Sequence, residues 1–194
     1  MLKPITKKMD LLETSLSLFV DQGIQKTSMA QISKKSGVAV GTIYHHFKSK
    51  EELIEGVYLY ILDDLGKHIA FKEDEIVLDF KERFSLLWMK GFNYYIKYPN
   101  RFRFHDTYSY SPLIPNSLRE YARAFYQTAF DFVEEGISKK ILIDTHPVLI
   151  MRWLYNSLAT IIQIKLDNEF GVTDKMVSTT LEMTWQSLTY KTEE

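Results

Sequence analysis

The sequence predicts an all-helical protein in which a small N-terminal helical domain precedes a larger one. Apolar residues recur three and four positions apart along nearly the whole chain, which is the spacing of a helix with one buried face. Capping signals, glycines and prolines divide this pattern into separate helices. The 194 residues, 45% of them hydrophobic, are sufficient for a core.

The helical spacing takes the form of successive stripes of apolar side chains. They comprise Met9, Leu12, Leu16, Phe19 and Val20; Leu53, Val57, Ile61 and Leu65; Phe80, Phe84, Trp88 and Phe92; Leu118, Tyr121, Phe125 and Phe132; Ile150, Leu154, Leu158 and Ile162; and Val177, Leu181, Trp185 and Leu188. No internal repeat or low-complexity tract interrupts them. Each stripe predicts one helix or the greater part of one.

The starts and ends of these helices have recognisable signals. A serine three positions before a glutamine or glutamate has the form of a capping box, in which the two side chains satisfy free backbone N–H groups. Such pairs are Ser28 with Gln31, Ser49 with Glu52, and Ser117 with Glu120. Helices are therefore expected to begin near residues 29, 50 and 118. Gly23 and Gly37 close the first two helices, Pro99 stops another, and Pro147 opens a later one.

Residues 101–110, RFRFHDTYSY, depart from helical spacing. Polar and aromatic residues partly alternate there, which is the period of a half-buried strand. The chain offers no second strand to pair with this segment. We therefore expect a short helix or an irregular connector.

Charge is unevenly placed along the chain. The formal net charge is -1, but the first 50 residues hold eight lysines against Asp10, Glu13 and Asp21, a net +5. The rest holds 16 basic and 22 acidic residues, a net -6. A basic head on an acidic body suits a protein that meets phosphates at one end only.

The residue content argues against several functions. There is no cysteine, so disulfides, thiolate metal sites and a cysteine nucleophile are absent. Neither Glu-x-x-His nor His-x-x-x-His occurs, and no glycine loop is present that would cradle a phosphate, so we expect no enzyme, no metal and no cofactor. The N-terminus lacks the apolar run of a signal peptide, and residues 148–166 are interrupted by Arg152, Asn156, Gln163 and Lys165. We expect a cytoplasmic protein with no membrane partner.

Residues 27–50, TSMAQISKKSGVAVGTIYHHFKSK, have the form of a helix-turn-helix. A short helix capped by Ser28 places Met29, Ile32 and Ser33 inward, and a second short helix begins near Val40. Gly37 between them permits the left-handed backbone that a tight interhelical turn needs. In such a unit the second helix enters the major groove of DNA.

This window resembles the TetR family of bacterial regulators. The residues that carry the likeness are Gly23, Ile24, Thr27, Ser28, Met29, Ile32, Gly37, Val38, Gly41, Thr42, Ile43, Tyr44, His45, His46, Phe47, Lys48, Lys50, Glu52 and Leu53. It covers about residues 6–60 in sequence detail, with helix count and length supporting it beyond. Two departures are Ser33 and Ser36, where the family more often has alanine. Both are small, so we expect little effect on packing.

The resemblance implies which residues contact double-stranded DNA. Val40, Gly41 and Tyr44 would face base edges. The residues nearer the phosphates would be Ser28, Thr42, His45, His46, Lys48 and Lys50. Ile43 and Phe47 are expected in the core, and either histidine is also open to a capping or packing role. Lys34 and Lys35 fit a solvated face better than a direct contact.

The middle of the chain is rich in aromatic residues. Fifteen of the 27 lie between residues 84 and 132, which fits either a well-filled core or a concave ligand site. The resemblance favours a site for a small-molecule effector of unknown identity. Its candidate residues are Trp88, Phe92, Tyr95, Phe104, Tyr108, Tyr121, Phe125, Arg152 and Asn156. Arg152, Asn156 and Gln163 share one side of their helix, where they would line this site or pair across a dimer. A buried Arg152 would need an acidic partner, with Asp131, Glu134 and Glu135 as candidates.

The resemblance also implies a homodimer formed by the last two long helices of each subunit. The residues expected at this interface are Leu154, Leu158, Ile162, Val177, Leu181 and Trp185. A two-fold dimer presents two recognition helices about 34 Å apart, as a palindromic operator requires.

Taken together, residues 1–50 are expected to form the helix-turn-helix domain, and residues 51–194 the domain that binds the effector and dimerises. The function implied is a one-component transcriptional regulator, a repressor, released from its operator by an apolar or aromatic small molecule. The alternative is a DNA-binding adaptor of the same fold whose body binds a protein partner. A small molecule that releases the operator would separate the two.

Overall fold

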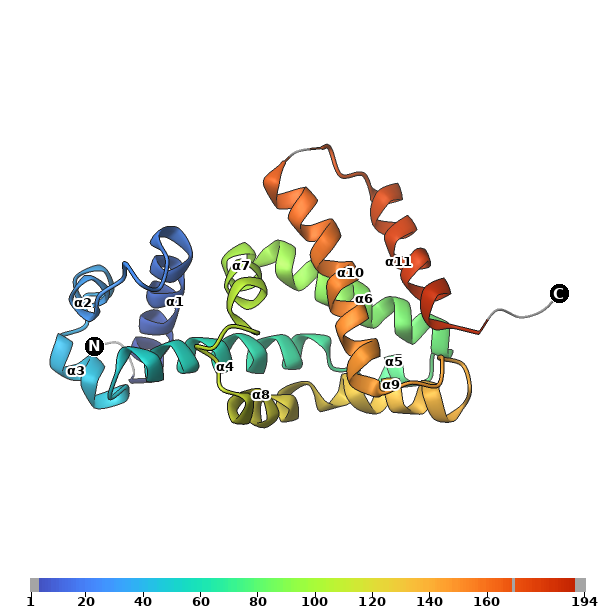
Figure 1. Ribbon diagram of the computed structural model, residues 1–194, viewed down its shortest axis with the longest axis horizontal. Coiled ribbons are helices and arrows are strands. Elements are labelled where there is room, and N and C mark those ends of the chain that lie inside the picture. The colour runs from blue at the N-terminus through green and yellow to red at the C-terminus, as the bar shows by residue number, and fades with distance from the viewer. Residues whose placement is uncertain (1–3, 169, 191–194) are drawn as a thin grey trace. The chain divides into compact units, whose positions relative to one another are not determined.

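A computed structural model describes residues 4–168 and 170–190 of the chain. Across these residues eleven α-helices follow one another (Figure 1). Their bounds are α1 Pro4–Gln22, α2 Met29–Ser36, α3 Val40–His46, α4 Lys50–Ile69, α5 Glu73–Ile76, α6 Phe80–Lys97, α7 Pro99–Tyr108, α8 Asn116–Ala122, α9 Gln127–Ser138, α10 Pro147–Asp167 and α11 Asp174–Leu188. A 3₁₀ turn, η1 (Arg123–Tyr126), precedes α9, and the described residues contain an isolated bridge between Leu142 and Thr189 but no strand. The all-α prediction is confirmed.

The chain divides into two compact units. Of the described residues, the first unit takes those up to Asp64 and Tyr98–Arg123, and the second takes Leu65–Lys97 and those from Ala124 onward. The chain therefore passes from one unit to the other three times: within α4, between α6 and α7, and within η1. The functional boundary expected at residue 50 stays a prediction, because a DNA-binding domain need not end where a compact unit ends.

The first unit has its core around α1. This helix packs against α2 and against α7. The fully buried apolar residues here include Leu11, Leu16, Phe19, Ile32, Ile43, Leu53, Ile54 and Phe104. Gly56 of α4 allows Phe47 to pack directly on that helix, because a Cβ at Gly56 would lie only 2.6 Å from Phe47 Cε1.

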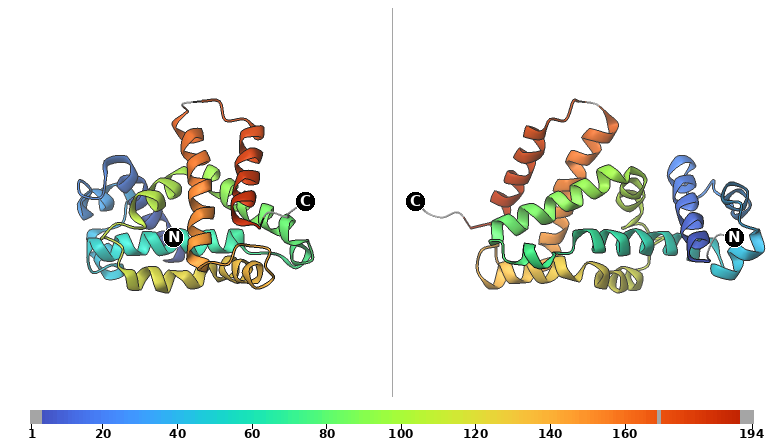
Figure 2. Two further views of the ribbon diagram at one scale, coloured as in Figure 1. Left: turned by 45° about the vertical axis from the view of Figure 1, so that its right-hand side comes forward. Right: turned by 180° about the vertical axis from the view of Figure 1, so that it is seen from behind.

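The second unit is filled by aromatic rings where α6, α9 and α11 meet. Phe80 of α6 stacks on Phe132 of α9 with ring centroids 4.3 Å apart. Phe84 meets Trp185 of α11 edge to face, with centroids 5.0 Å apart. α10 packs against α6, α9 and α11, and α10 and α11 lie side by side (Figure 2). These aromatic contacts account for much of the apolar periodicity in the second half of the chain.

Most helix ends follow the sequence signals. Ser28 forms a reciprocal capping box with Gln31, and Gly37 ends α2 in the left-handed conformation, with φ 69°. Gly23 does the same after α1, with φ 85°. Ser49 Oγ accepts the N–H of Glu52 at 3.1 Å, as expected, but the Glu52 carboxylate accepts the N–H of Lys48 and not that of Ser49.

Two segments near the middle differ in outcome. The capping box predicted for Ser117 is wrong: α8 begins at Asn116 directly after Pro115, and no side chain caps it. A proline already has the φ of about -65° that suits the first residues of a helix, so the start needs no serine. The segment at residues 101–110 is mostly helical, because α7 extends to Tyr108. The short-helix alternative is therefore the correct one.

Candidate DNA interface and effector region

The turn between α2 and α3 is held by two serine hydroxyls. Ser33 Oγ donates to the carbonyl of Val38 at 2.7 Å, and Ser36 Oγ accepts the N–H of Val38 at 3.2 Å. From the sequence, both serines are expected only to be small enough to leave the packing of the two helices unaffected. The signal available was their place on either side of Gly37, since serines near a turn often bond to its backbone. Together with the left-handed Gly37 they fix how α3 leaves α2.

α3 has one buried side and one exposed side. Ile43 is completely buried and Phe47 nearly so, as predicted. Val40 and Tyr44, four residues apart and therefore on one face, are 38% and 45% exposed. Gly41, Thr42, His45 and His46 are exposed as well. The helix thus presents a short row of apolar, hydroxyl and imidazole groups that its own unit does not cover.

The candidate phosphate contacts lie around α3. Ser28 and Lys48 are exposed, and Lys50 is half-buried at the first position of α4. Lys8 of α1 lies over the ring of Phe47, with Nζ 5.6 Å from the centroid. This contact was not foreseen, because residues 39 positions apart share no local pattern. It places a cation of α1 beside the C-terminal end of α3.

The nine expected effector residues are divided between the two compact units. Phe104, Tyr108 and Tyr121 belong to the first unit and the other six to the second. In the second unit Trp88 and Phe92 stack with centroids 5.8 Å apart, and Trp88 Nε1 donates to Ser157 Oγ at 2.9 Å. Tyr95 is buried and meets the ring of Tyr155 at 6.4 Å. Phe125 is half-buried, whereas Tyr121, Arg152 and Asn156 are exposed.

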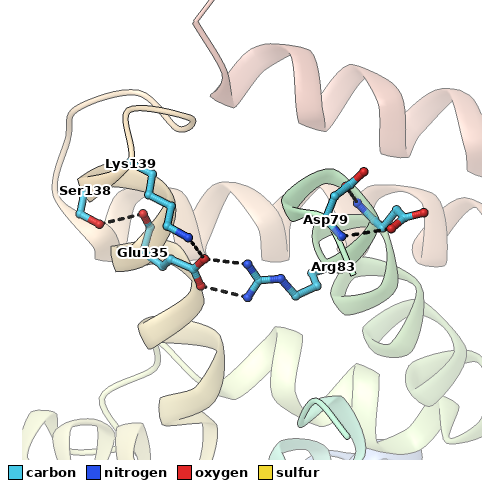
Figure 3. Close-up of polar contacts among 6 residues, drawn as sticks. Asp79, Arg83, Glu135, Ser138 and Lys139 are labelled. Carbon is cyan, nitrogen blue, oxygen red and sulfur yellow. Dashed lines mark hydrogen bonds and ion pairs between the residues drawn. The ribbon is translucent and has the colours of Figure 1, made fainter. Parts of the chain in front are cut away.

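Arg152 is exposed, so it is not a buried arginine that needs an acidic partner. Glu135, one of the three acids weighed as its partner, is held by Arg83 of α6 and by Lys139 (Figure 3). The two Arg83–Glu135 hydrogen bonds are 2.9 and 2.7 Å long. Hydrogen bonds from Arg83 and then from Lys139 lower the pKa of Glu135 to about 2. This carboxylate supports the packing of α6 on α9.

The six residues expected at the dimer interface are largely covered by their own chain. Leu154, Leu158, Ile162 and Val177 are buried, while Leu181 and Trp185 are half-buried. These four side chains are covered within one chain, and a role at an interface stays a prediction for all six. The exposed large apolar residues of these helices are Leu149, Trp153 and Met183. Trp153 Nε1 donates to Ser187 Oγ at 2.7 Å, so α10 and α11 contribute to one continuous surface.

Two features are absent from residues 4–168 and 170–190. No group of three or more histidine and acidic side chains could hold a metal ion there. No helix there is both long and apolar enough to cross a bilayer. His45 and His46 lie with ring centroids 5.5 Å apart, edge to face, on the exposed side of α3.

Known proteins share both the helix-turn-helix and the whole fold. Residues 11–57 match the family model described as bacterial regulatory proteins, tetR family. A TetR family transcription regulator from Shewanella sp. PV-4 superposes with a TM-score of 0.85 at 26% identity, over 95% of this chain and 99% of that one. The match to the TetR family thus covers the helix-turn-helix in sequence and nearly the whole chain in fold. The TetR resemblance drawn from the sequence is confirmed.

Two relatives that are similar in sequence match over only part of their length. The HTH-type transcriptional repressor KstR2 of Mycolicibacterium smegmatis (strain ATCC 700084 / mc(2)155) is 36% identical over 61 residues, which are 31% of this chain and 30% of KstR2. An HTH-type transcriptional regulator of Staphylococcus aureus (strain bovine RF122 / ET3-1) is 34% identical over 124 residues, 62% of this chain and 61% of that one. The chain thus spans less than two thirds of either relative.

A more distant solved structure contains a ligand. The transcriptional regulator FadR from Bacillus subtilis, solved in complex with stearoyl-CoA, superposes with a TM-score of 0.72 at 18% identity. The match covers 93% of this chain and 99% of FadR. At this identity the likeness shows the fold alone. These relatives are named as regulators, which agrees with the expectation that this chain is not an enzyme.

Proposed function

We propose that this protein is a transcriptional repressor that binds a palindromic DNA operator as a homodimer and is released by an apolar or aromatic small molecule. The single observation that carries the DNA-binding part is the exposed face of α3. A helix held by a helix-turn-helix, with Ile43 and Phe47 buried and Val40 and Tyr44 uncovered, presents its side chains as major-groove readers do. Gly41 lets the backbone approach the groove closely, and Val40 suits a thymine methyl.

The first experiment is a selection of bound duplexes from random oligonucleotides, followed by titration of the selected sequence. We expect an inverted repeat, because a two-fold dimer reads two equal half-sites. Affinity should fall steeply with salt as lysines displace condensed counterions. Equal binding to the palindrome and to its scrambled sequence would contradict the proposal.

Two substitutions assign roles within this interface. Tyr44→Ala should weaken specific binding by about 1 to 3 kcal/mol and leave non-specific binding unchanged. Lys50→Ala should weaken binding to all sequences alike and lower the salt slope by about one. Lys175→Ala is the matched control, since it removes the same charge from an exposed position of α11. Its salt slope should equal that of the wild type, and a Tyr44→Ala variant with full specificity would show that α3 reads no bases.

We place the dimer surface on the exposed side of α10 and α11. Leu149 and Trp153 are one turn apart on α10, and Met183 is one turn before Ser187, which Trp153 contacts. All three apolar side chains are at least half exposed. Neighbouring uncovered apolar groups of this size are typical of a surface that a partner covers. A second copy satisfies this need and supplies the symmetry that the palindrome requires.

The effector is proposed to act on α6 of the second unit. Trp88, Phe92 and Tyr95 follow one side of that helix, and a ligand that shifts them would also shift the chain leading to α7. FadR, which shares the fold, was solved with stearoyl-CoA, so a ligand with a long acyl chain is one candidate for this protein. Release requires that the ligand bind more tightly to the conformation with wrongly spaced recognition helices, and coupling of about 1 to 3 kcal/mol is typical.

A screen separates this repressor from the adaptor alternative. Stearoyl-CoA, other lipids, aromatic acids and cationic dyes are each added to the protein bound to its selected palindrome. A small-molecule repressor releases the DNA with one class of compound, and Tyr95→Ala reduces that response. The adaptor alternative replaces the small-molecule repressor if no compound releases the DNA or raises the melting temperature, while a cell extract still releases the DNA.

A further inference from the structure

Arg101 is the centre of a charged cluster inside the first unit. It lies on α7 and is only 6% exposed. Its Nε donates to Glu13 Oε1 of α1 at 3.2 Å and its Nη2 bonds the same oxygen, while Nη1 donates to Asp64 Oδ2 of α4. Nη2 also donates to Tyr60 Oη at 2.7 Å, and Tyr60 Oη donates to Glu13 at 2.7 Å. One guanidinium thus joins three helices.

The surroundings of the guanidinium explain why it can be buried. The ring centroids of Tyr98 and Tyr60 lie 4.2 and 4.9 Å from Arg101 Cζ, so π-faces as well as carboxylates surround the charge. Burial, and then the hydrogen bond to Glu13, raises the pKa of Tyr60, so its hydroxyl stays a donor at neutral pH. A lysine cannot replace this arrangement, because it lacks the planar fork that serves several acceptors at once.

The Arg101 cluster also includes the two residues at which the chain leaves the first unit and returns to it. Asp64 is the last residue of the first unit along α4, and Tyr98 is the residue with which the chain returns to it. Arg101 contacts both, and through Glu13 it ties them to α1. Since α1 packs on α2, two of the three covalent connections between the units are fixed to the helices that carry the helix-turn-helix.

We propose that Arg101 is a positioning residue for operator recognition that sets which spacing between half-sites the dimer accepts. The inference rests on the proposed function, because it assumes a dimer that reads a palindrome. A single half-site needs only one correctly folded α3. Two half-sites also require that the two helix-turn-helix regions of the dimer are held at a defined separation. A helix-turn-helix region whose connections at Asp64 and Tyr98 are not fixed tolerates other separations.

The experiment compares three duplexes with each variant: the selected palindrome, the same half-sites with the spacer changed by one or two base pairs, and an isolated half-site. Arg101→Gln and Glu13→Gln break the cluster at two different residues. Arg103→Gln removes the same charge from an exposed position of the same helix and is the control. We expect both cluster variants to lose about fivefold or more of the preference for the selected spacing, the lower range of typical coupling between sites. Half-site affinity should change less than twofold.

The outcomes discriminate between alternatives. Unchanged spacing preference in Glu13→Gln, which keeps the shape of the side chain, overturns the inference even if Arg101→Gln fails to fold. An equal loss at half-site and palindrome overturns it too, because the cluster would then only stabilise the fold. A wild-type protein with no spacing preference contradicts the proposed function itself. Arg103→Gln is expected to match the wild type on all three duplexes, and a loss there equal to that of Arg101→Gln would show that charge alone matters.

Discussion

Arg83 is held between aromatic rings and a carboxylate. Its Cζ lies 5.6 Å from the ring centroid of Phe80 and 5.2 Å from that of Phe132, and both Nη atoms bond Glu135 (Figure 3). The pKa of Arg83 is raised chiefly by its hydrogen bond to Glu135. The two charges therefore stabilise each other where α6 meets α9, and removing one leaves the other partly buried without its partner.

The first stability prediction concerns the pH dependence of this pair. Because the pKa of Glu135 is about 2 in the folded chain and 4.5 in the reference state, its contribution is complete above about pH 5 and is lost as pH falls toward 2. Glu135→Gln should lower the free energy of unfolding at pH 7 by about 2 kcal/mol. Urea titrations at several pH values should show the difference from wild type vanish by about pH 2.

The control for this titration is Glu73→Gln, the same chemical change at an exposed position of the same unit. Its effect should be within about 0.5 kcal/mol of zero, as for most surface substitutions. A Glu135→Gln variant whose difference from wild type stays constant from pH 7 to pH 2 would show that packing, and not the charge, accounts for the loss.

Single residues differ in how far the sequence alone could place them. Ile43 in the core and Tyr44 on the surface follow from the helical spacing of a short window, so both predictions succeeded. The partners of Arg83 and Arg101 lie 52 and 88 residues away. No local pattern links charges at such separations. From the sequence, the arginine considered for a buried ion pair is therefore Arg152, which is exposed in the structure.

At the scale of helices, Gly66 shows a packing requirement that periodicity does not reveal. It lies near the end of α4. From the sequence alone, a glycine in a helix is expected only to lower helix stability by about 1 kcal/mol relative to alanine. In the structure a Cβ at this position would lie 1.8 Å from the carbonyl oxygen of Phe125 and 2.7 Å from its carbon. Both atoms belong to backbone, which cannot move aside as a side-chain tip can. The absent side chain lets α4 and η1 touch.

The prediction at this scale is that Gly66→Ala destabilises the protein although alanine favours helices. Overpacking typically costs about 1 to 3 kcal/mol, which exceeds the gain in helix propensity. The denaturant midpoint should fall with little change in the m-value. Gly171→Ala is the control, because a Cβ there meets nothing within 4 Å. If Gly66→Ala proves as stable as Gly171→Ala, the close approach of η1 to α4 is wrong.

Helix ends were predictable to the extent that their signals are local. The capping box of Ser28, the left-handed Gly37 and the proline that opens α10 each act within a few residues. The start of α8 was misplaced because Ser117 matched a pattern, whereas the N-cap residue is Pro115, two residues earlier, and α8 begins at Asn116. Where two signals compete, the sequence does not say which one the chain uses.

At the scale of the whole molecule, burial separates the residues that build a subunit from those that can join two. The stripe of Leu154, Leu158 and Ile162 is expected at the dimer interface from the family resemblance, and in the structure the chain itself covers it. α6 and α9 both pack on α10, and the sequence alone does not show that these helices cover it. What is left uncovered on α10 and α11 is the side that carries Trp153 and Met183. We therefore propose this uncovered side of α10 and α11 as the dimer surface.

The prediction for the whole molecule follows from that face. In a two-fold dimer the same patch meets itself, so a charge introduced there is brought close to its own copy and is also desolvated. Met183→Arg should convert the dimer to a monomer at micromolar concentration while leaving the circular dichroism spectrum of a folded helical protein. Sedimentation velocity measures the first effect. Leu181→Arg would be a poorer test, because Leu181 is half-buried and its substitution also threatens the fold.

The matched control is Val77→Arg, which places the same charge on an exposed apolar residue just after α5, 83% exposed. This variant should remain a dimer. Because dimerisation doubles the number of DNA contacts, Met183→Arg should also reduce binding to the palindrome far more than binding to a half-site, whereas Val77→Arg should change neither. A Met183→Arg protein that still sediments as a dimer would move the interface away from α10 and α11, and the spacing argument built on Arg101 would then need another symmetry axis.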